Sequence, residues 1–195
     1  MIPESHFVDN LALATSVKDI AGCIVECGVW RGGMSAGLAS LLGPNRTYYL
    51  FDSFEGLPPA QEIDGSSAIA WQKDTTSKNY YDNCSAPLDF ANEAMKNSKA
   101  SDFHLVKGWF SETLPTFPQA KPIALLRLDG DWYESTWVCL EFLYRNVTEN
   151  GIIIIDDYYT WDGCTRAVHD FLSKNSITDR IRSTGKTCYI VKGKV

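Results

Sequence analysis

The sequence has too little positive charge for a protein that binds nucleic acid over a large surface. Its 195 residues include 18 lysines and arginines against 24 aspartates and glutamates, and the net charge is −6. Proteins that cover a nucleic-acid backbone usually present a basic face. We therefore expect no nucleic acid among its partners.

Long apolar runs are also missing. No stretch approaches the roughly 18 apolar residues of a membrane-spanning helix, so we expect no membrane partner. The first six residues lack the charged and apolar regions of a secretory signal. Together these absences predict a cytoplasmic protein.

Several common site motifs are absent. The six cysteines form no C-x-x-C pair, and buried reduced thiols are preferred over disulfides or zinc ligands. The three histidines lack H-x-x-x-H spacing, and His169 is interpreted as structural. The dinucleotide motif G-x-G-x-x-G and a following Tyr-x-x-x-Lys are both missing, which argues against an NAD(P)-dependent reductase.

Strand and helix patterns alternate along the chain. Strands are predicted at 24–26, 47–52, 103–107, 123–128, 151–155, 180–183 and 187–191, and helices at 5–20, 33–42, 89–98, 135–145 and 164–174. This alternation, closed by a hairpin through Gly185, predicts a single doubly wound α/β domain over residues 1–195. Ligands of such sheets bind at the carboxyl ends of the strands.

The first two predicted strands carry the features of a nucleoside site. Strand one leads into Glu26-Cys27-Gly28-Val29-Trp30-Arg31-Gly32-Gly33, whose glycines permit a tight turn and close approach of a ligand to helix amides. Strand two ends in Asp52, and a carboxylate there suits the hydroxyls of a ribose. The pair predicts a bound nucleoside cofactor.

Aspartates follow the next two buried strands. Asp129 ends one strand, and Asp156 and Asp157 follow four isoleucines at the end of the other. On adjacent parallel strands, the three carboxylates would repel one another unless protonated or bridged by a cation, most plausibly Mg²⁺. The alternative is that these aspartates cap helices. Asp131, four residues before Ser135, fits that second role well.

A long polar segment, residues 53–88, separates strand two from the next helix. A loop of this length inside a compact domain is usually a lid or binding loop. Its aromatic residues Trp71, Tyr80 and Tyr81 have two interpretations. They either cover a ligand or tether the loop to the protein surface.

The longest motifs resemble those of the macrocin O-methyltransferase family. They are Glu26 to Gly33, Phe51-Asp52-Ser53-Phe54-Glu55-Gly56-Leu57-Pro58, Gly108-Trp109-Phe110, Leu114-Pro115, Leu126-Arg127-Leu128-Asp129-Gly130-Asp131, Tyr133-Glu134-Ser135-Thr136 and Ile155-Asp156-Asp157-Tyr158. The resemblance implies a class I S-adenosylmethionine-dependent methyltransferase with sheet order 3-2-1-4-5-7-6 and strand seven antiparallel. It also implies Mg²⁺-dependent methyl transfer to a hydroxyl of a sugar or glycosylated natural product.

The resemblance implies roles for single residues as well. Seven positions match cofactor contacts: Glu26, Gly28 and Trp30 at the methionine end, Asp52 and Ser53 at the ribose, and Gly108 and Trp109 beside the adenine. Three match metal ligands: Asp129, Asp156 and Asp157. Related catechol-type methyltransferases place a lysine base near the first metal aspartate, but residues 131–133 contain none. Asp129 is therefore the candidate base.

Two features depart from the family pattern. Only residues 1–23 precede strand one, whereas family members commonly carry longer helical segments that help build the acceptor site and the dimer. Residues 61–87 match no family pattern. The acceptor is thus defined only as a hydroxylated small molecule, and a homodimer is one option for the assembly. A non-catalytic nucleoside-binding module remains as an alternative.

Overall fold

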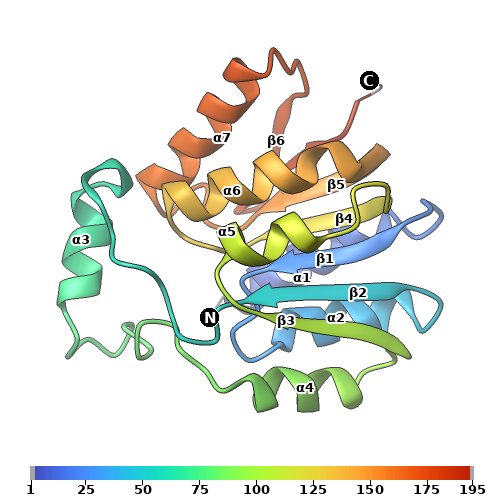
Figure 1. Ribbon diagram of the computed structural model, residues 1–195, viewed down its shortest axis with the longest axis horizontal. Helices are drawn as coiled ribbons and strands as arrows, with labels where there is room; N and C mark the ends of the chain where they lie inside the picture. Colours follow the sequence, from blue (N-terminus) through green and yellow to red (C-terminus); the bar gives the residue numbers. More distant parts are fainter. Residues whose placement is uncertain (1–2, 194–195) are drawn as a thin grey trace.

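The computed structural model describes residues 3–193. Seven strands form one sheet in the order β3-β2-β1-β4-β5-β7-β6 (Figure 1). Strands β1 to β5 pair in parallel, and β7 runs antiparallel to both β5 and β6. The predicted order and the predicted antiparallel strand are confirmed.

The strands are β1 (Cys23–Cys27), β2 (Thr47–Asp52), β3 (Asp102–Lys107), β4 (Ile123–Leu128), β5 (Val147–Ile155), β6 (Ile181–Thr184) and β7 (Thr187–Val191). The helices are α1 (Glu4–Thr15), α2 (Gly33–Leu42), α3 (Ser66–Lys73), α4 (Leu88–Lys96), α5 (Phe110–Thr113), α6 (Tyr133–Leu143) and α7 (Asp162–Lys174). Short 3₁₀ turns lie at η1 (Glu62–Asp64), η2 (Leu114–Thr116) and η3 (Tyr144–Asn146). None of the helices in the described residues is both long and apolar enough to cross a bilayer.

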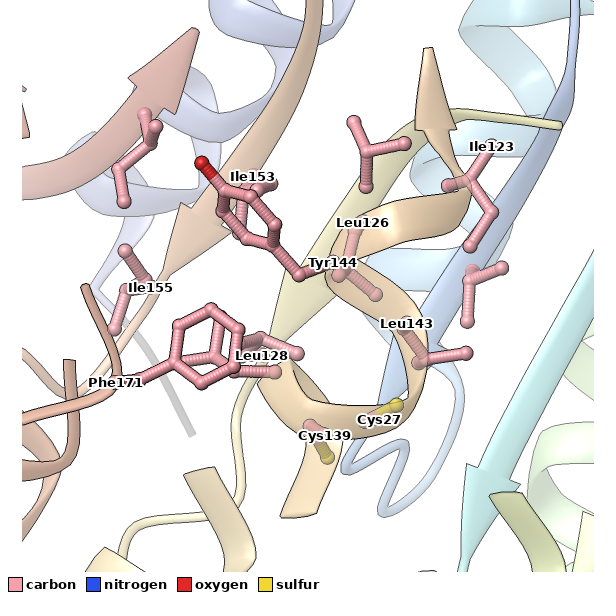
Figure 2. Packing of buried hydrophobic residues seen from close by; sticks show 14 of the residues in the cluster. Cys27, Ile123, Leu126, Leu128, Cys139, Leu143, Tyr144, Ile153, Ile155 and Phe171 are labelled. Atoms are coloured by element: carbon pink, nitrogen blue, oxygen red, sulfur yellow. The ribbon is translucent and has the colours of Figure 1, made fainter. Parts of the chain in front are cut away.

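Helices cover both faces of the sheet. Helices α5, α6 and α7 lie in front of it in Figure 1, and α1 and α2 lie behind it. The front core joins Leu126, Leu128 and Ile153 of the central strands to Leu143 and Phe171 of the helices (Figure 2). Because both faces are covered, all six residues of β4 are buried, as its continuous apolar run predicts.

Several predicted boundaries are wrong by a few residues. Helix α1 ends at Thr15 rather than at residue 20, and β5 begins at Val147 rather than at 151. The larger correction concerns residues 53–88, which contain η1 and α3 and are not a plain loop. Helix α3 has only eight residues, so tertiary contacts and not an apolar repeat hold it in place. It stands apart from both helical layers, beside the carboxyl ends of the strands (Figure 1).

Candidate active site

One cavity of about 590 Å³ opens at the carboxyl ends of the central strands. This volume is typical of a site for a small molecule. Nine of the predicted site residues line it: Gly28, Trp30, Asp52, Ser53, Gly108, Trp109, Asp129, Asp156 and Asp157. Glu26 lies behind the wall, and its cofactor contact stays a prediction. The structure therefore brings the predicted nucleoside and carboxylate features to one cavity.

The turn after β1 requires glycine. Gly28 has φ +92°, and a Cβ there would lie 1.8 Å from the backbone oxygen of Asp129. The Gly28 N–H donates to the Phe51 carbonyl at 2.9 Å, which joins the turn to the end of β2. The ends of β1, β2 and β4 can meet this closely only because residue 28 has no side chain.

Asp52 binds two turns together. Its Oδ2 accepts hydrogen bonds from the backbone N–H groups of Val29 at 2.6 Å and Trp30 at 2.8 Å. Its Oδ1 accepts from the backbone N–H of Phe54 at 2.6 Å. A carboxylate offers about four acceptor positions, so one remains for a ribose hydroxyl. Asp52 thus has a structural role that the sequence analysis did not predict.

Ser53, Gly108 and Trp109 complete this side of the cavity. The Ser53 hydroxyl donates to the Gly56 carbonyl at 2.8 Å, so it is engaged within its own turn. Gly108 has φ +143°, and its N–H donates to the Asp52 carbonyl at 2.9 Å. Trp109 is 37% exposed and lines the cavity. An apolar ring at that position suits the face of a base.

Arg127 joins carboxylates from three strands. Its side chain is 1% exposed, and one terminal nitrogen donates to Glu26 at 2.7 Å and to Asp129 at 2.8 Å. The other terminal nitrogen donates to Asp156. Asp129 and Asp156 are thereby held at the ends of β4 and β5. A charged residue inside the apolar run of β4 is a sequence signal that could have identified this role.

Burial shifts the acidic groups of the site toward their neutral forms. Burial raises the pKa of Glu26 to about 7, against the opposing influence of Arg127. Burial and the neighbouring carboxylates raise the pKa of Asp156, and that of Asp157 well above its usual range. One buried arginine therefore faces more acidic groups than it can neutralise.

The three predicted metal ligands fit a divalent cation. Asp129, Asp156 and Asp157 each offer a carboxylate oxygen, and these oxygens lie within 4.8 Å of one another. Arg127 occupies Oδ2 of Asp129 and Oδ1 of Asp156, which leaves a second oxygen on each. Hard oxygen donors of this kind suit Mg²⁺. The donor set and the surplus negative charge both agree with such an ion.

Helix capping does not explain these aspartates. Helix α7 begins at Asp162, and its N-cap, Trp161, makes no side-chain cap bond. Asp131 was expected to cap α6, but this expectation is wrong because α6 begins at Tyr133. Instead the Asp131 carboxylate accepts from the Trp161 indole at 2.8 Å, and its backbone N–H donates to Asp157 at 3.0 Å. Burial raises the pKa of Asp131 to about 7.

Residues 53–88 form the outer wall of the cavity. Trp71 of α3 packs against Trp132 and Trp161, with ring centroids 6.1 Å and 5.9 Å away. We call these three residues the tryptophan cluster. Trp71 and Tyr81 also line the cavity, whereas Tyr80 packs on Trp71 at 5.5 Å. The segment is thus tethered to the protein body, which agrees with the tethering interpretation. Trp71 and Tyr81 also face the cavity, and the interpretation that they cover a ligand stays a prediction.

A left-handed turn holds the end of this segment. Residues 81–84 all have φ between +50° and +59°, a conformation that is costly for residues other than glycine. Asn83 stabilises it, because its backbone and side chain both pair with the backbone of Leu57. The Gln72 amide donates to the Asn83 side chain at 2.9 Å. These contacts place Tyr81 and Cys84 on the cavity wall.

The sequence analysis missed His6. It lies on α1, lines the cavity, and its Nε2 is 3.6 Å from Oδ1 of Asp156. No local motif connects residues 150 positions apart, so only the fold reveals this proximity. His169, by contrast, is exposed on α7 and outside the cavity lining, where it pairs with the Tyr158 hydroxyl at 2.8 Å.

The sheet order and the glycine turn at the cavity are those of a class I methyltransferase. The family model described as macrocin-O-methyltransferase (TylF) matches residues 6–192. The chain therefore belongs to the macrocin O-methyltransferase family.

Two relatives illustrate the similarity in sequence. The chain is 33% identical to demethyldecarbamoylnovobiocin O-methyltransferase of Streptomyces niveus, over 84% of this chain and 63% of the relative. It is 34% identical to the 8-demethyl-8-(2,3-dimethoxy-alpha-L-rhamnosyl)-tetracenomycin-C 4'-O-methyltransferase of Streptomyces olivaceus, over 89% of this chain and 68% of the relative. The matched part is thus about two thirds of each curated relative.

Two solved methyltransferase structures are similar to this chain in fold. The O-methyltransferase NovP superposes with a TM-score of 0.78 at 29% identity, covering 96% of this chain and 79% of that one. The calicheamicin methyltransferase CalS11 superposes with a TM-score of 0.77 at 25% identity, and the superposition covers 97% of this chain and 79% of CalS11.

Proposed function

We propose that this chain transfers a methyl group from S-adenosylmethionine to a hydroxyl of a small molecule, either a sugar or a glycosylated natural product. One observation carries the proposal. The glycine turn, Asp52 and the three aspartates Asp129, Asp156 and Asp157 line a single cavity. The relatives support the reaction, because each is named as an O-methyltransferase. The homodimer and the cytoplasmic location stay predictions.

The nucleoside half of the cofactor belongs at β1 and β2 in this proposal. The free acceptor position of Asp52 takes a ribose hydroxyl, and Gly28 lets the cofactor approach the backbone closely. Trp109 offers its ring to the adenine. These residues would hold the cofactor when it is bound, and such positioning is the protein's main contribution to an in-line displacement.

The acceptor belongs at β4 and β5. A divalent ion held by Asp129, Asp156 and Asp157 would orient the acceptor oxygens and lower the pKa of the attacking hydroxyl. Asp129 is the most exposed of the three carboxylate side chains that pair with Arg127, at 30%, and we propose that it accepts the hydroxyl proton. Arg127 keeps that carboxylate in place, and the tryptophan cluster limits the access of water.

A transfer assay tests the proposal. The full chain is incubated with S-adenosylmethionine carrying a labelled methyl group and with hydroxylated sugars and glycosides, in Mg²⁺ or in EDTA. We expect labelled product in Mg²⁺ and none in EDTA, while calorimetry shows that S-adenosylhomocysteine still binds. Transfer that persists in EDTA would overturn the metal assignment. Cofactor binding without transfer to any acceptor would favour the non-catalytic module, and binding of NAD alone would favour the reductase.

A further inference from the structure

The lining of the cavity is acidic. Six carboxylate side chains belong to it: Asp52, Asp129, Asp131, Glu134, Asp156 and Asp157. Among residues 3–193, no lysine or arginine lines the cavity, and the Arg127 side chain, 1% exposed, lies behind its wall. Proteins usually bind phosphate groups through arginine, lysine or helix-terminal amides. A cofactor with a net positive charge suits this cavity, whereas a phosphorylated acceptor does not.

One wall of the cavity is aromatic. Trp71 and Trp161 line it, and Trp132, which is 2% exposed, packs behind them with ring centroids 6.1 Å and 5.3 Å away. Trp161 follows β5, whereas Trp109 follows β3, and the strands β2, β1 and β4 lie between β3 and β5 in the sheet. This wall is therefore separate from the ring of Trp109, which the proposed function assigns to the adenine.

The indole N–H groups of the tryptophan cluster are all engaged within the protein. Trp71 donates to the Asn79 carbonyl at 3.0 Å, and Trp161 donates to the Asp131 carboxylate at 2.8 Å. Trp132 donates to the Pro58 carbonyl at 2.9 Å. An indole has no other hydrogen-bonding group, so Trp71 and Trp161 offer a ligand only the surface of their rings. Such a surface suits the flat apolar face of another ring.

Contacts on both sides of Trp71 place its ring at the wall. Asp64 of η1, which is 3% exposed, accepts from the backbone N–H of Tyr133 at 2.7 Å, at the start of α6. Gln72, the residue after Trp71, donates from its side chain to the Pro58 carbonyl at 2.9 Å. Asp64 thereby also takes a helix-terminal amide that could otherwise bind a phosphate.

The aromatic wall adjoins the carboxylates at the ends of β4 and β5. The Asp131 carboxylate accepts from the Trp161 indole, and the Asp131 backbone N–H donates to Asp157 at 3.0 Å. Two hydrogen bonds thus connect Trp161 to one of the proposed metal ligands. The next step rests on the proposed function, which places the acceptor hydroxyl at these aspartates. A sugar held there has its neighbouring group beside Trp71 and Trp161.

We propose that the acceptor is a sugar already joined to an uncharged, flat apolar ring system, and that this ring system lies on Trp71 and Trp161. Sugar phosphates and sugar nucleotides are rejected, because their phosphates would face a lining of carboxylates. The reaction that supplies the substrate is then a glycosyl transfer to the ring system, and methylation follows it. Trp71 belongs to residues 61–87, which match no family pattern, so this selectivity arises from a segment particular to this chain.

Three forms of one sugar separate the ring from the phosphate. They are the 4-nitrophenyl glycoside, the methyl glycoside and the nucleoside diphosphate ester, each prepared with glucose, galactose, mannose and rhamnose. Calorimetry measures their affinities for the full chain loaded with S-adenosylhomocysteine and Mg²⁺, and a labelled methyl group measures transfer to each. The variants are Trp71→Leu and Trp71→Phe. Trp137→Leu is the matched control, because Trp137 lies outside the cavity lining.

We expect the wild type to bind at least one nitrophenyl glycoside about fivefold more tightly than its methyl partner, as a contact between aromatic rings implies. Trp71→Leu should lower this preference below about twofold without weakening the methyl glycoside, and Trp71→Phe should keep part of it. Trp137→Leu should keep all of it. The sugar nucleotides should receive no methyl group.

A change of charge tests the rejection of phosphate. Glu134→Lys places a cation in the lining and should tighten the binding of the sugar nucleotides about two- to fivefold. Glu141→Lys is the control, because Glu141 is exposed on the same helix, α6, but lies outside the lining. Equal effects of the two substitutions would mean that the lining does not select against phosphate.

Other results also overturn the inference. They are a wild type without preference for any nitrophenyl glycoside, or one that methylates a sugar nucleotide as fast as a glycoside. If Trp71→Leu weakens both glycosides equally, Trp71 only supports the wall. A wild type that does not bind S-adenosylhomocysteine would refute the proposed function itself, whereas cofactor binding without the ring preference refutes the inference alone. If Trp71→Leu fails to fold, as thermal unfolding would show, Trp71→Phe and the wild type decide.

Discussion

The proposed cofactor side of the cavity, at β1 and β2, and the proposed acceptor side, at β4 and β5, differ in which part of the chain builds them. On the cofactor side, Gly28 and Gly108 act through their backbone N–H groups, and the Asp52 carboxylate accepts from the backbone of Val29 and Trp30, so short hydrogen bonds close the turns after neighbouring strands. On the acceptor side, long side chains from distant segments meet in the Arg127 network and the tryptophan cluster.

The cofactor side therefore depends mainly on backbone geometry, whereas the acceptor side depends mainly on buried charge. Backbone turns tolerate changes in neighbouring side chains, provided that the glycines and Asp52 remain. The acceptor side depends on a balance between one buried cation and several acidic groups, and such a balance fails when either partner is removed. We therefore expect substitutions on the acceptor side to have the larger effects.

The largest expected effect comes from removing the charge of Arg127. Arg127→Met leaves buried carboxylates without their cation, so it should lower the free energy of unfolding by about 3–5 kcal/mol. Denaturation in urea measures this loss. Arg166→Met, on the exposed face of α7, is the control and should change stability by less than about 0.5 kcal/mol. A loss for Arg127→Met as small as that of the control would show that the ion pairs of Arg127 do not stabilise the fold.

The next effect tests the metal ligands. Asp157→Asn tests the metal role more directly than Asp156→Asn, because Asp156 also accepts a hydrogen bond from Arg127. It should lower the rate of methyl transfer at least about 100-fold, equivalent to about 2.7 kcal/mol, without weakening cofactor binding. Excess Mg²⁺ should restore part of the rate, and EDTA should act on the wild type as the substitution does. The exposed Asp170→Asn is the control, and unchanged transfer in Asp157→Asn would exclude the metal role.

The two sides also differ in how far the sequence predicts them. The cofactor side follows local rules: β2 ends at Asp52 where the prediction places it, and Gly28 has the positive φ that a tight turn requires. On the acceptor side, the convergence of Asp129, Asp156 and Asp157 was predictable, because each ends one of two adjacent parallel strands.

What the sequence does not predict are contacts between distant segments. His6 reaches Asp156, and Trp71 reaches Trp132 and Trp161, only through the folded chain. Asp131 was assigned to a helix cap from its spacing, but its left-handed backbone turns the carboxylate toward Trp161. Spacing identifies a strand end well, but it does not fix the direction of a side chain in the loop that follows.

On the cofactor side, Asp52→Ala should weaken binding of S-adenosylhomocysteine by about 1.5–3 kcal/mol, the range for a lost hydrogen bond to a charged group. Part of this loss should come from the turn, since Asp52 also binds the backbone of Val29 and Trp30. Calorimetry measures the affinity. Asp102→Ala, on the exposed edge strand β3, is the control. Unchanged affinity in Asp52→Ala would refute the ribose assignment.

An effect of similar size should appear in the dependence of stability on pH. The pKa of Glu26 is about 7 in the folded protein and 4.5 in a model compound, so the folded state binds more protons between these values. The free energy of unfolding should therefore fall as the pH rises from 5 to 8. Glu26→Gln removes this titration and should reduce the fall by about 2.5 kcal/mol, which is what a pKa raised from 4.5 to about 7 implies over this range. Urea denaturation at several pH values measures it, and parallel curves for the two proteins would contradict the assignment.

The smallest effect concerns residues 53–88, which connect the two sides. We predict that this segment opens without ligands and closes over cofactor and acceptor, because it forms the outer cavity wall yet contributes few residues to either core. Trp71→Ala removes the aromatic contacts of α3, worth about 0.5–1.5 kcal/mol, so it should speed amide exchange in the segment about two- to tenfold. Trp137→Ala, outside the cavity, should leave exchange in residues 53–88 unchanged. Ligands should slow exchange in the wild type, and equally slow exchange with and without them would show that the segment is a fixed wall and not a lid.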